Sequence, residues 1–444
     1  MINLNKNVIV NSEEKIFVFD ISSRGNIMYK QLDCNMNLIE SADLNDDIVY
    51  NYSATIDQND IIHLIALINT GELCYYKYID GQWHKNIIAM FNLKSNIYNQ
   101  FETLIIKDKL HLIYNYSHLI NSNIWTIQHV VYDNKREEQY NVVRYISKKE
   151  PEPFIVDVDS IGNIHLLYVN HINNYSQIYH SFYSLYGKMW NPHPELLSYD
   201  NINNFFPYLL IDSRNNIHCI WIEDLRYKFN LKMIRMSLSG RDKYKWNEIQ
   251  LPSITVSNGY PILFEHNNIL NLLFNSKDKI ILLKSDNYGN TWIKSNEEHY
   301  IKDNTEIVKL KISPLNYPDK INTAFIVEGN DEKITFLHHF LNNKSLFEGE
   351  SPEKTVINSE NESEINYEAV NTCDDEEINS KIDNYLQYMF EINNKLEEIL
   401  NNQNQISLNL EKLANNQSEN MKKLDILENL IKNKNKSIWE KIFK

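Results

Sequence analysis

The chain has little positive charge and no long apolar run, and each shortage excludes a class of protein. Its 444 residues carry a formal net charge of -15. A general nucleic-acid binder needs a basic surface that displaces counterions from phosphates, so we expect no nucleic-acid partner. No apolar run reaches the roughly 18 residues of a membrane-spanning helix. The first residues lack the basic-then-apolar pattern of a secretory signal, and we therefore expect a cytoplasmic protein.

Cysteine is also scarce. The four cysteines are Cys34, Cys74, Cys219 and Cys373, which lie far apart and form no C-x-x-C pair. Closely spaced cysteines are typical of disulfide frameworks and of structural zinc sites, so this distribution argues against both. We expect reduced thiols, no bound metal and no cofactor.

What the chain does contain is a recurring strand motif. Four segments place a histidine directly after an Ile or Leu residue, and two later segments have asparagine in its place. The copies are residues 62–65, 110–113, 164–167, 217–220, 270–273 and 321–324. Successive copies lie 48, 54, 53, 53 and 51 residues apart, and residues 16–19 fit as a degenerate first copy. Self-similarity at a fixed period indicates stacked supersecondary units.

Each period contains four short strand signals and no helical periodicity. Runs rich in Ile, Val, Tyr and Phe are bounded by Asp, Asn and Gly, as strands usually are. The clearest unit has strand signals at 154–157, 164–169 and 177–183, followed by Gly187 and Trp190 before a fourth. Four-stranded units repeated radially form a β-propeller. We predict an all-β propeller over residues 1–345, with seven blades favoured and six as the alternative.

A turn in the sixth unit carries a family resemblance. Residues Ser285, Asn287, Gly289, Thr291 and Trp292 match the pattern S-x-D-x-G-x-T-W, with asparagine in place of the aspartate. This segment resembles the Asp-box of the sialidase-like, BNR-repeat propellers. In that family the box shapes a turn: the side chain at the aspartate position bonds the backbone, the glycine turns and the tryptophan packs. The resemblance therefore implies a fold and no catalytic role.

Sialidase activity itself is not expected. A sialidase holds its substrate carboxylate with three arginines, the first usually in an R-I-P context. This chain has seven arginines and none of them precedes Ile-Pro. Nothing in their spacing suggests three guanidinium groups converging on one carboxylate. We expect a protein that is not an enzyme; a glycoside hydrolase or lyase that uses the adjacent acids Glu223 and Asp224 is the alternative.

The repeated histidines invite a metal interpretation, which geometry disfavours. Equivalent positions on neighbouring blades lie on different sheets, about 10 Å apart, whereas zinc needs its ligands at about 2 Å. We predict instead partly buried imidazoles that bond across their own sheet or to the preceding turn.

The loops between the second and third strands of the middle units are the predicted ligand face. They are longer than the loop after Leu67 and carry His, Tyr, Asn, Asp and Arg, which suit sugar or peptide recognition. Ordinary solvated loops are the alternative. The predicted ligand-binding residues are His118, Trp125, His171, Tyr175, Glu223, Asp224, Arg226 and Tyr227.

The composition changes after Phe347. Residues 346–377 are polar and acidic and predict a flexible linker. A heptad pattern follows over 378–432 and predicts a coiled coil. The apolar positions that we expect to drive oligomerisation are Ile382, Tyr385, Met389, Ile392, Leu396, Ile399, Ile406, Leu410, Leu413, Leu424 and Leu427. Isoleucine at one core position and a widened stripe favour a trimer or tetramer over a dimer; a helix folded on its own propeller is the alternative.

The last residues, 433–444, are basic and carry an apolar face of Ile438, Trp439, Ile442 and Phe443. Such a segment can bind an anionic membrane surface or a partner groove, and a helix end favoured by its dipole is the alternative. The whole pattern predicts a non-catalytic, multivalent scaffold whose head binds a glycan or a protein. A receptor-binding component of a coat, appendage or phage fibre, incorporated into a spore, envelope or virion, is a further alternative.

Overall fold

The structure is a computed structural model that describes most of the predicted propeller. The described residues are 2–133, 136–148, 150–199, 201–226, 228–239, 243–254, 259–276, 279–295, 299–300, 305–315, 320–327 and 333–337. The predicted linker, coiled coil and basic tail lie outside the described residues. Within them, no helix is both long enough and apolar enough to cross a membrane.

The described strands form six sheets, which we number in chain order. The first sheet contains β1 (Ile2–Val10), β2 (Ile16–Ile21), β3 (Ile27–Leu32), β4 (Leu38–Asp43), β27 (Thr305–Ile312), β28 (Thr323–Val327) and β29 (Lys333–Phe336). The second sheet contains β5 (Val49–Ile56), β6 (Ile62–Ile68), β7 (Glu72–Ile79) and β8 (Gln82–Met90). The third sheet contains β9 (Asn96–Ile106), β10 (Lys109–His118), β11 (Ile124–Asp133) and β12 (Arg136–Ile146), with a short 3-10 helix, η1 (Leu119–Asn121), between β10 and β11.

The remaining three sheets repeat this plan. The fourth contains β13 (Ile155–Val158), β14 (Ile164–Ile172), β15 (Tyr175–Ser184), β16 (Met189–Trp190) and β17 (Glu195–Leu196). The fifth contains β18 (Asn203–Ile211), β19 (Ile217–Asp224), β20 (Phe229–Met236) and β21 (Trp246–Ile249). The sixth contains β22 (Pro261–His266), β23 (Ile269–Ser276), β24 (Lys279–Ser285), β25 (Ile293–Lys294) and β26 (His299–Tyr300).

Burial along the strands explains why the sequence forms them. The second strand of the second sheet, β6, is buried at every position, and its sequence is a continuous apolar run with one histidine. The outer strand β4 is exposed at nearly every position and carries Glu40, Ser41 and Asp43. A strand covered on both faces must be apolar throughout, whereas an outer strand meets water.

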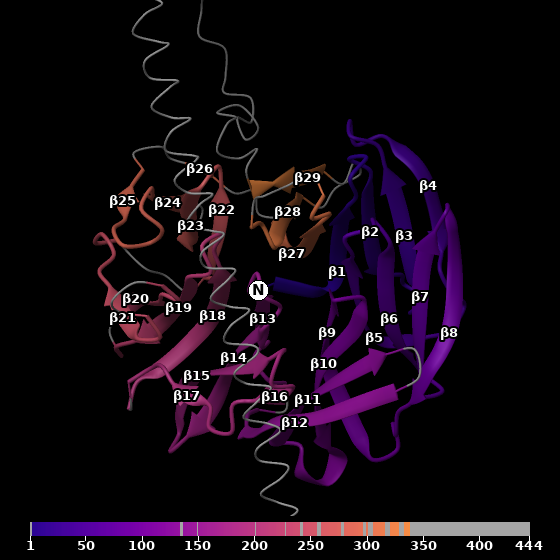
Figure 1. The fold of residues 1–444 in the computed structure, drawn as a ribbon, viewed down its shortest axis with the longest axis horizontal. Helices are drawn as coiled ribbons and strands as arrows, with labels where there is room; N and C mark the ends of the chain where they lie inside the picture. Colours follow the sequence, from indigo (N-terminus) through magenta and orange to yellow (C-terminus); the bar gives the residue numbers. More distant parts are fainter. Residues whose placement is uncertain are drawn as a thin grey trace, which may run out of the picture. The chain divides into compact units, whose positions relative to one another are not determined.

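The hydrophobic core is divided among the spaces between neighbouring sheets. One cluster joins the first and second sheets, and separate clusters join the second to the third, the third to the fourth and the fourth to the fifth. A larger cluster joins the fifth and sixth sheets to the first. Because each sheet packs on the next and the last packs on the first, the sheets close into a ring, which Figure 1 shows. This arrangement is the predicted β-propeller.

Among the described strands, one pair is parallel, and this pair closes the ring. The inner strands β1 and β27 pair in parallel, with Val8 opposite Leu310. Lys6 of β1 is 3% exposed. Its Nζ lies 3.4 Å from Oε2 of Glu306 on β27, and 3.3 Å from Oδ2 of Asp20. The first and last strand groups thus share one sheet, and the choice between seven blades and six stays a prediction.

The turns before the repeated motif tie neighbouring sheets together. Ser12, between β1 and β2, donates its backbone N–H to Asp60 of the second sheet (2.8 Å). Ser160 of the fourth sheet donates its N–H to Oδ1 of Asn215 of the fifth (2.8 Å). The hydroxyl of Ser213 of the fifth sheet in turn donates to Oε1 of Glu265 of the sixth (2.6 Å). These polar contacts lie at one end of the sheets and supplement the apolar packing between them.

Candidate functional site

Two of the repeated histidines bond to the turn that precedes them. Nε2 of His218 lies 2.9 Å from Oδ2 of Asp212, and both side chains are fully buried. Nε2 of His63 lies 3.2 Å from Oδ2 of Asp57, and its Nδ1 lies 2.6 Å from the hydroxyl of Tyr75. Burial lowers the pKa of His63. The interpretation of these histidines as bonded packing residues is confirmed.

The other two bond across their sheets to a second histidine. Nδ1 of His111 lies 3.0 Å from Nε2 of His129, and Nδ1 of His165 lies 3.1 Å from Nε2 of His180. Burial lowers the pKa of His111 to about 4 and that of His180 to about 3, so both rings are neutral near pH 7. These pairs, too, are part of the packing.

The five residues that resemble an Asp-box shape the turn between β24 and β25. The N–H of Gly289 donates to Oγ of Ser285 (2.9 Å), and the N–H of Thr291 donates to Oδ1 of Asn287 (3.0 Å). The amide of Asn287 also donates to Oγ1 of Thr291 (2.7 Å). Gly289 has a φ of +79°, and Trp292 is buried. Asparagine thus caps this turn through its oxygen and adds one bond through its nitrogen.

Two of the predicted ligand residues line cavities on the predicted loop face. His118, at the end of β10, lines a cavity of about 540 Å³ together with Tyr116, Asn121 and Arg144. His171, at the end of β14, lines a second cavity of about 680 Å³ together with Lys148. Burial, with Lys148 nearby, lowers the pKa of His171. The two histidines therefore do not share one site.

The other predicted ligand residues are distributed between the core and the surface. Trp125 is 0% exposed and its indole N–H donates to the carbonyl of Lys148 (3.0 Å), so it packs in the core. Glu223 is buried and accepts from Nδ2 of Asn230 (3.0 Å). Asp224 accepts the backbone N–H of the exposed Arg226 (2.9 Å) and thereby shapes its own loop. Tyr175 is half-buried at the start of β15, and Tyr227 lies outside the described residues.

The segment around His171 is a hairpin, where a longer loop was expected. Residues 170–172 continue strand β14, and β15 begins at Tyr175. Only Asn173 and Asn174 form the turn, with φ values of 50° and 69°. Two successive left-handed residues match the twist of a hairpin, and asparagine tolerates this conformation. The turn chemistry of Asn-Asn was therefore the local signal that the loop prediction missed.

A larger groove lies between the second and third sheets, where no residue was predicted. Its volume is about 960 Å³. The second sheet contributes Tyr75 and Lys77 to its wall, and the third sheet contributes Asp108, Tyr132 and Glu137. Ile87, on the edge strand β8, also lines the groove and is 56% exposed. The groove thus combines aromatic and apolar surface with polar side chains.

The groove is acidic. Asp57, Asp108, Asp133 and Glu137 line it, and Lys77 is the one lysine or arginine among the described residues of its wall. Oδ2 of Asp133 pairs with Nζ of Lys109 at 2.7 Å. Asp57 forms hydrogen bonds within its own turn, where its Oδ1 accepts the N–H groups of Asn59 and Ile61. Asp108 accepts a long hydrogen bond from Nε2 of Gln58 (3.4 Å), and Glu137 accepts one from Nε2 of Gln139, both through one carboxylate oxygen. The second oxygen of each carboxylate can accept a hydrogen bond from a ligand.

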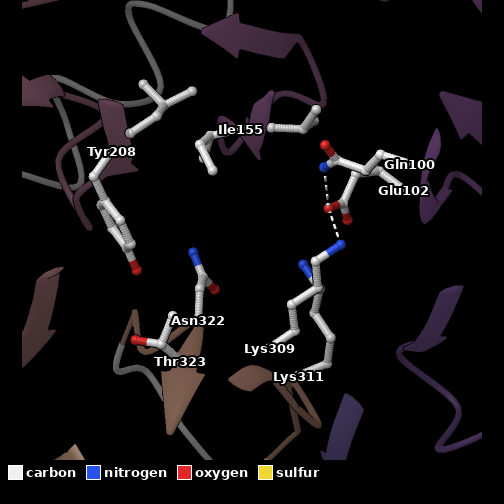
Figure 2. A pocket seen from close by; sticks show the side chains of 10 residues that line it. Gln100, Glu102, Ile155, Tyr208, Lys309, Lys311, Asn322 and Thr323 are labelled. Carbon is white, nitrogen blue, oxygen red and sulfur yellow. Dashed lines mark hydrogen bonds and ion pairs between the residues drawn. The ribbon is translucent and has the colours of Figure 1, made fainter. Parts of the chain in front are cut away.

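A smaller cavity lies among the inner strands β9, β13, β18 and β27 (Figure 2). Glu102 of β9 forms an ion pair with Lys309 of β27, which is distant in sequence. The side-chain amide of Gln100 donates to Oε1 of Glu102 (3.1 Å). It also donates to the backbone carbonyl of Phe154 and accepts the backbone N–H of Phe154. This network of polar side chains connects the third sheet to the first through Lys309 and to the start of the fourth through Phe154.

One carboxyl near the inner strands is unusual. Burial raises the pKa of Glu152 to about 7, although a backbone hydrogen bond from Phe206 opposes the shift. Its Oε2 has no hydrogen-bond partner among the described residues. Phe206 has a φ of 54° at a bulge in β18, and its ring lies 4.5 Å from that of Tyr260. A carboxyl that changes charge near neutral pH is a candidate general acid.

Comparison with known proteins yields no family model and no curated protein that matches the chain. Several solved structures, in contrast, can be superposed on this chain. The BP39L lectin from Burkholderia pseudomallei is 12% identical, with 75% of this chain and 94% of that chain covered at a TM-score of 0.48. An Aleuria aurantia lectin with a six-bladed β-propeller fold and a fucose recognition mode is 10% identical, with 65% and 93% covered at 0.35.

An α-L-arabinanase from Penicillium chrysogenum, solved with arabinobiose, is 12% identical. The match covers 62% of this chain and 92% of the arabinanase at a TM-score of 0.39. Both sugar-binding proteins and enzymes therefore occur among these structures, and the identities are far too low to transfer a function. The function of this chain has to be argued from its own residues.

Proposed function

We propose that this chain is a non-catalytic, multivalent carbohydrate-binding protein whose groove between the second and third sheets takes a neutral oligosaccharide. The groove supports this proposal because its volume of about 960 Å³ suits a di- or trisaccharide, near the top of the usual range of about 300–1,000 Å³ for ligand sites. It also places tyrosine rings and an exposed isoleucine beside carboxylate acceptors, which matches the mixed apolar and hydroxyl surface of a sugar.

The charge of the groove favours uncharged sugars. Hydroxyl groups can donate to the carboxylates of Asp108 and Glu137, and the C–H face of a pyranose can pack against Tyr75, Tyr132 or Ile87. A sialic or uronic acid would place its carboxylate among four acidic side chains, and like charges in a partly enclosed site repel each other. The same argument disfavours sialidase chemistry.

Multivalency rests on the heptad pattern of residues 378–432. Three or four heads on one stalk would raise a weak affinity for a surface that carries many copies of the glycan, because the second contact becomes intramolecular. We also infer that the first sheet comprises two blades, β1–β4 and β27–β29, which gives the favoured total of seven. The parallel pairing of β1 and β27 supports this, since inner strands of neighbouring blades run in the same direction.

The test uses the full chain and a panel of neutral and acidic oligosaccharides. We expect binding of neutral members, and a light-scattering mass of three or four times 52.7 kDa. The double variant D108N/E137Q should bind the best neutral sugar about tenfold or more weakly, since each hydrogen bond to a charged group contributes roughly 1.5–3 kcal/mol. The exposed Asp286 provides the matched control D286N, which should bind normally.

Equal binding by the double variant, or a preference for acidic sugars, would contradict the groove as the site. A monomeric mass would contradict self-assembly without affecting the groove. Release of free sugar from any panel member would instead support the alternative, a glycoside hydrolase. The observation that favours this alternative is the pKa of Glu152, which burial raises to about 7. If the variant E152Q releases no sugar, Glu152 is the general acid of that hydrolase.

A further inference from the structure

The groove between the second and third sheets differs in charge from the other three cavities described above. Among the described residues, its wall carries four carboxylates and one lysine, Lys77. Each of the other three cavities has more lysine or arginine than carboxylate in its described wall. Arg144 lines one of them and Lys148 another, and neither of these two walls has a carboxylate among its described residues. Of these cavities, the groove therefore offers a cationic ligand the most favourable potential.

The open carboxylates of the groove stand beside aromatic and apolar surface. Asp108 and Glu137 are exposed. Glu137 on β12 lies directly opposite Tyr132 on β11, and both line the groove. Ile87 of the second sheet is 56% exposed and lines it as well. A segment that carries both lysines and large apolar side chains could use all of these groups at once.

One lysine of the wall already shows how the rings hold a cation. Nζ of Lys77 lies 5.3 Å from the centroid of the Tyr75 ring, within the reach of about 6 Å over which a ring attracts an ammonium group. Tyr132 lines the same groove from the third sheet and is half-buried. Its ring, with Glu137 beside it, offers a comparable position to a lysine from outside the wall.

The basic tail (residues 433–444) has the complementary character. It contains four lysines and one glutamate, in a chain whose net charge is -15. Ile438, Trp439, Ile442 and Phe443 follow one another at intervals of one, three and one residues. This spacing would bring all four side chains to one face of a helix. The tail thus combines positive charge with large apolar side chains, as the groove requires.

The chain between the propeller and the tail is long enough for the two to meet. Fully extended, residues 338–377 span about 130 Å. The coiled coil predicted over residues 378–432 would be roughly 80 Å long. Because the reach of the polar segment exceeds the length of the coil, the tail can return to the groove.

We propose that the basic tail, residues 433–444, docks in the groove and competes there with the glycan. This inference concerns the regulation of the proposed glycan site and rests on that function, although docking itself requires no sugar. The lysines of the tail pair with Asp108 and Glu137, and its aromatic face packs against Tyr132 and Ile87. A dense glycan surface displaces the tail, because a ligand that binds the open groove raises the population of open grooves.

Zero-length cross-linking of the full chain tests docking without a sugar. A carbodiimide joins a lysine amine to a carboxylate where the two groups are in contact, and mass spectrometry identifies the linked peptides. We expect links from the lysines of the tail to Asp108 or Glu137. Their yield should fall about fivefold when the salt is raised from about 0.05 M to about 0.5 M, since exposed ion pairs are screened.

Two charge-reversal variants of the full chain provide the comparison. K441E/K444E keeps Lys434 and Lys436, and the links from these two lysines should fall about fivefold or more, because the net charge of the tail is reversed. The matched control K94E/K294E changes two exposed lysines that do not line the groove, and it should keep all of the links.

The neutral sugar that binds best measures the competition. K441E/K444E should bind this sugar about three- to tenfold more tightly than the unaltered chain, because an apparent dissociation constant rises as the fraction of open grooves falls. The control K94E/K294E should bind the sugar as the unaltered chain does.

Absence of links between the tail and the groove at low salt would overturn the proposal. Binding of the unaltered chain, but not of K441E/K444E, to phosphatidylserine vesicles would then assign the tail to a membrane. Equal sugar affinities of K441E/K444E and the unaltered chain would overturn the competition and leave the glycan groove in place. If no neutral sugar binds, the glycan function fails, and the cross-links still decide whether the tail docks.

Discussion

The third and fifth sheets carry the same histidine motif, but they satisfy the buried imidazole in different ways. In the fifth sheet the preceding turn supplies Asp212, which lies 2.9 Å from His218. In the third sheet the preceding turn is a hairpin of Lys107 and Asp108, with φ values of 48° and 61°, and His111 bonds instead to His129 on the next strand. A buried polar ring needs a partner, and the short third-sheet turn leaves His111 to find its partner on the next strand. The fourth sheet combines both arrangements, because His165 lies 3.1 Å from His180 and 3.7 Å from Asp159 of the preceding turn.

The hydrogen bonds of the third-sheet histidines also determine which ring nitrogen of His129 carries the proton. The indole N–H of Trp190 donates to Nδ1 of His129 (3.2 Å). His129 must therefore carry its proton on Nε2, where it donates to Nδ1 of His111. A second proton on His129 would face the Trp190 donor, so this pair is built for neutral rings, whereas the Asp212 pair offers a carboxylate.

The largest expected effect comes from converting the fifth-sheet aspartate to asparagine. Oδ2 of Asp212 accepts from both Nδ2 of Asn216 (2.7 Å) and Nε2 of His218 (2.9 Å). The amide of D212N cannot leave an acceptor for both of these buried donors and for the turn N–H groups that bond Oδ1. We expect a loss of about 3–5 kcal/mol in the free energy of unfolding, measured by urea denaturation.

The matched control is D108N in the third-sheet hairpin. Asp108 is exposed and has a left-handed backbone that asparagine tolerates, so the change should cost less than about 0.5 kcal/mol. Similar losses of unfolding free energy in D212N and D108N would show that the hydrogen bond from Asp212 does not stabilise the buried His218. The contrast between the two sheets would then be wrong.

The second-largest expected effect is a loss of folding stability at acid pH, which arises from the buried His111 of the third sheet. The pKa of His111 is about 4 in the folded protein, because burial disfavours its charged form, against an ordinary value of about 6.5. The unfolded chain takes up the proton first, so this contribution to stability is lost as the pH falls from about 6.5 to about 4 and is constant outside that window. The expected loss is about 3 kcal/mol from this ring, at about 1.36 kcal/mol per pKa unit.

Urea unfolding at several pH values measures this dependence. The double variant H111F/H129F removes both rings and should show a flatter decline between pH 6.5 and 4 than the unaltered chain. An unchanged slope in the double variant would show that the pair does not titrate as its burial implies.

The smallest expected effect tests how the fifth-sheet histidine meets the sixth sheet. A Cβ added to Gly289 would lie 2.6 Å from Cε1 of His218, whereas one added to Gly81 meets no atom within 4 Å. The two glycines have nearly equal φ values, +79° and +78°, so the backbone strain of an alanine is the same at both. G289A should therefore cost about 1–3 kcal/mol more than G81A, the penalty for overpacking. Equal midpoints in thermal unfolding would contradict the close packing of the Gly289 turn on His218.

Much of the fold could be predicted because its signals are local. The strand predicted over 164–169 was visible as an apolar run after a turn rich in Asp and Asn, and it forms most of β14. The same order returned in other units. The turn at Asn287 was predicted from the resemblance of residues 285–292 to the Asp-box pattern. These features depend on residues within a few positions of each other, which a sequence displays directly.

The candidate site was predictable only in part. His118 and His171 do line cavities on the predicted face, but the indole of Trp125 turned inward to pack and to bond the carbonyl of Lys148. The groove escaped prediction because Tyr75 and Glu137 belong to different repeats, and nothing in either repeat shows which residues of its neighbour it will face.

By itself, the sequence determined the all-β repeat, the turns that precede the repeated motif and the need for a partner at each buried histidine, since periodicity and turn chemistry are properties of neighbouring residues. Only the tertiary structure decided which partner each histidine took, that β1 and β27 would pair within one sheet, and that Glu102 of β9 and Lys309 of β27 would form an ion pair. Those outcomes depend on the distance between residues far apart in the chain, and this distance is set by how the sheets pack around the ring.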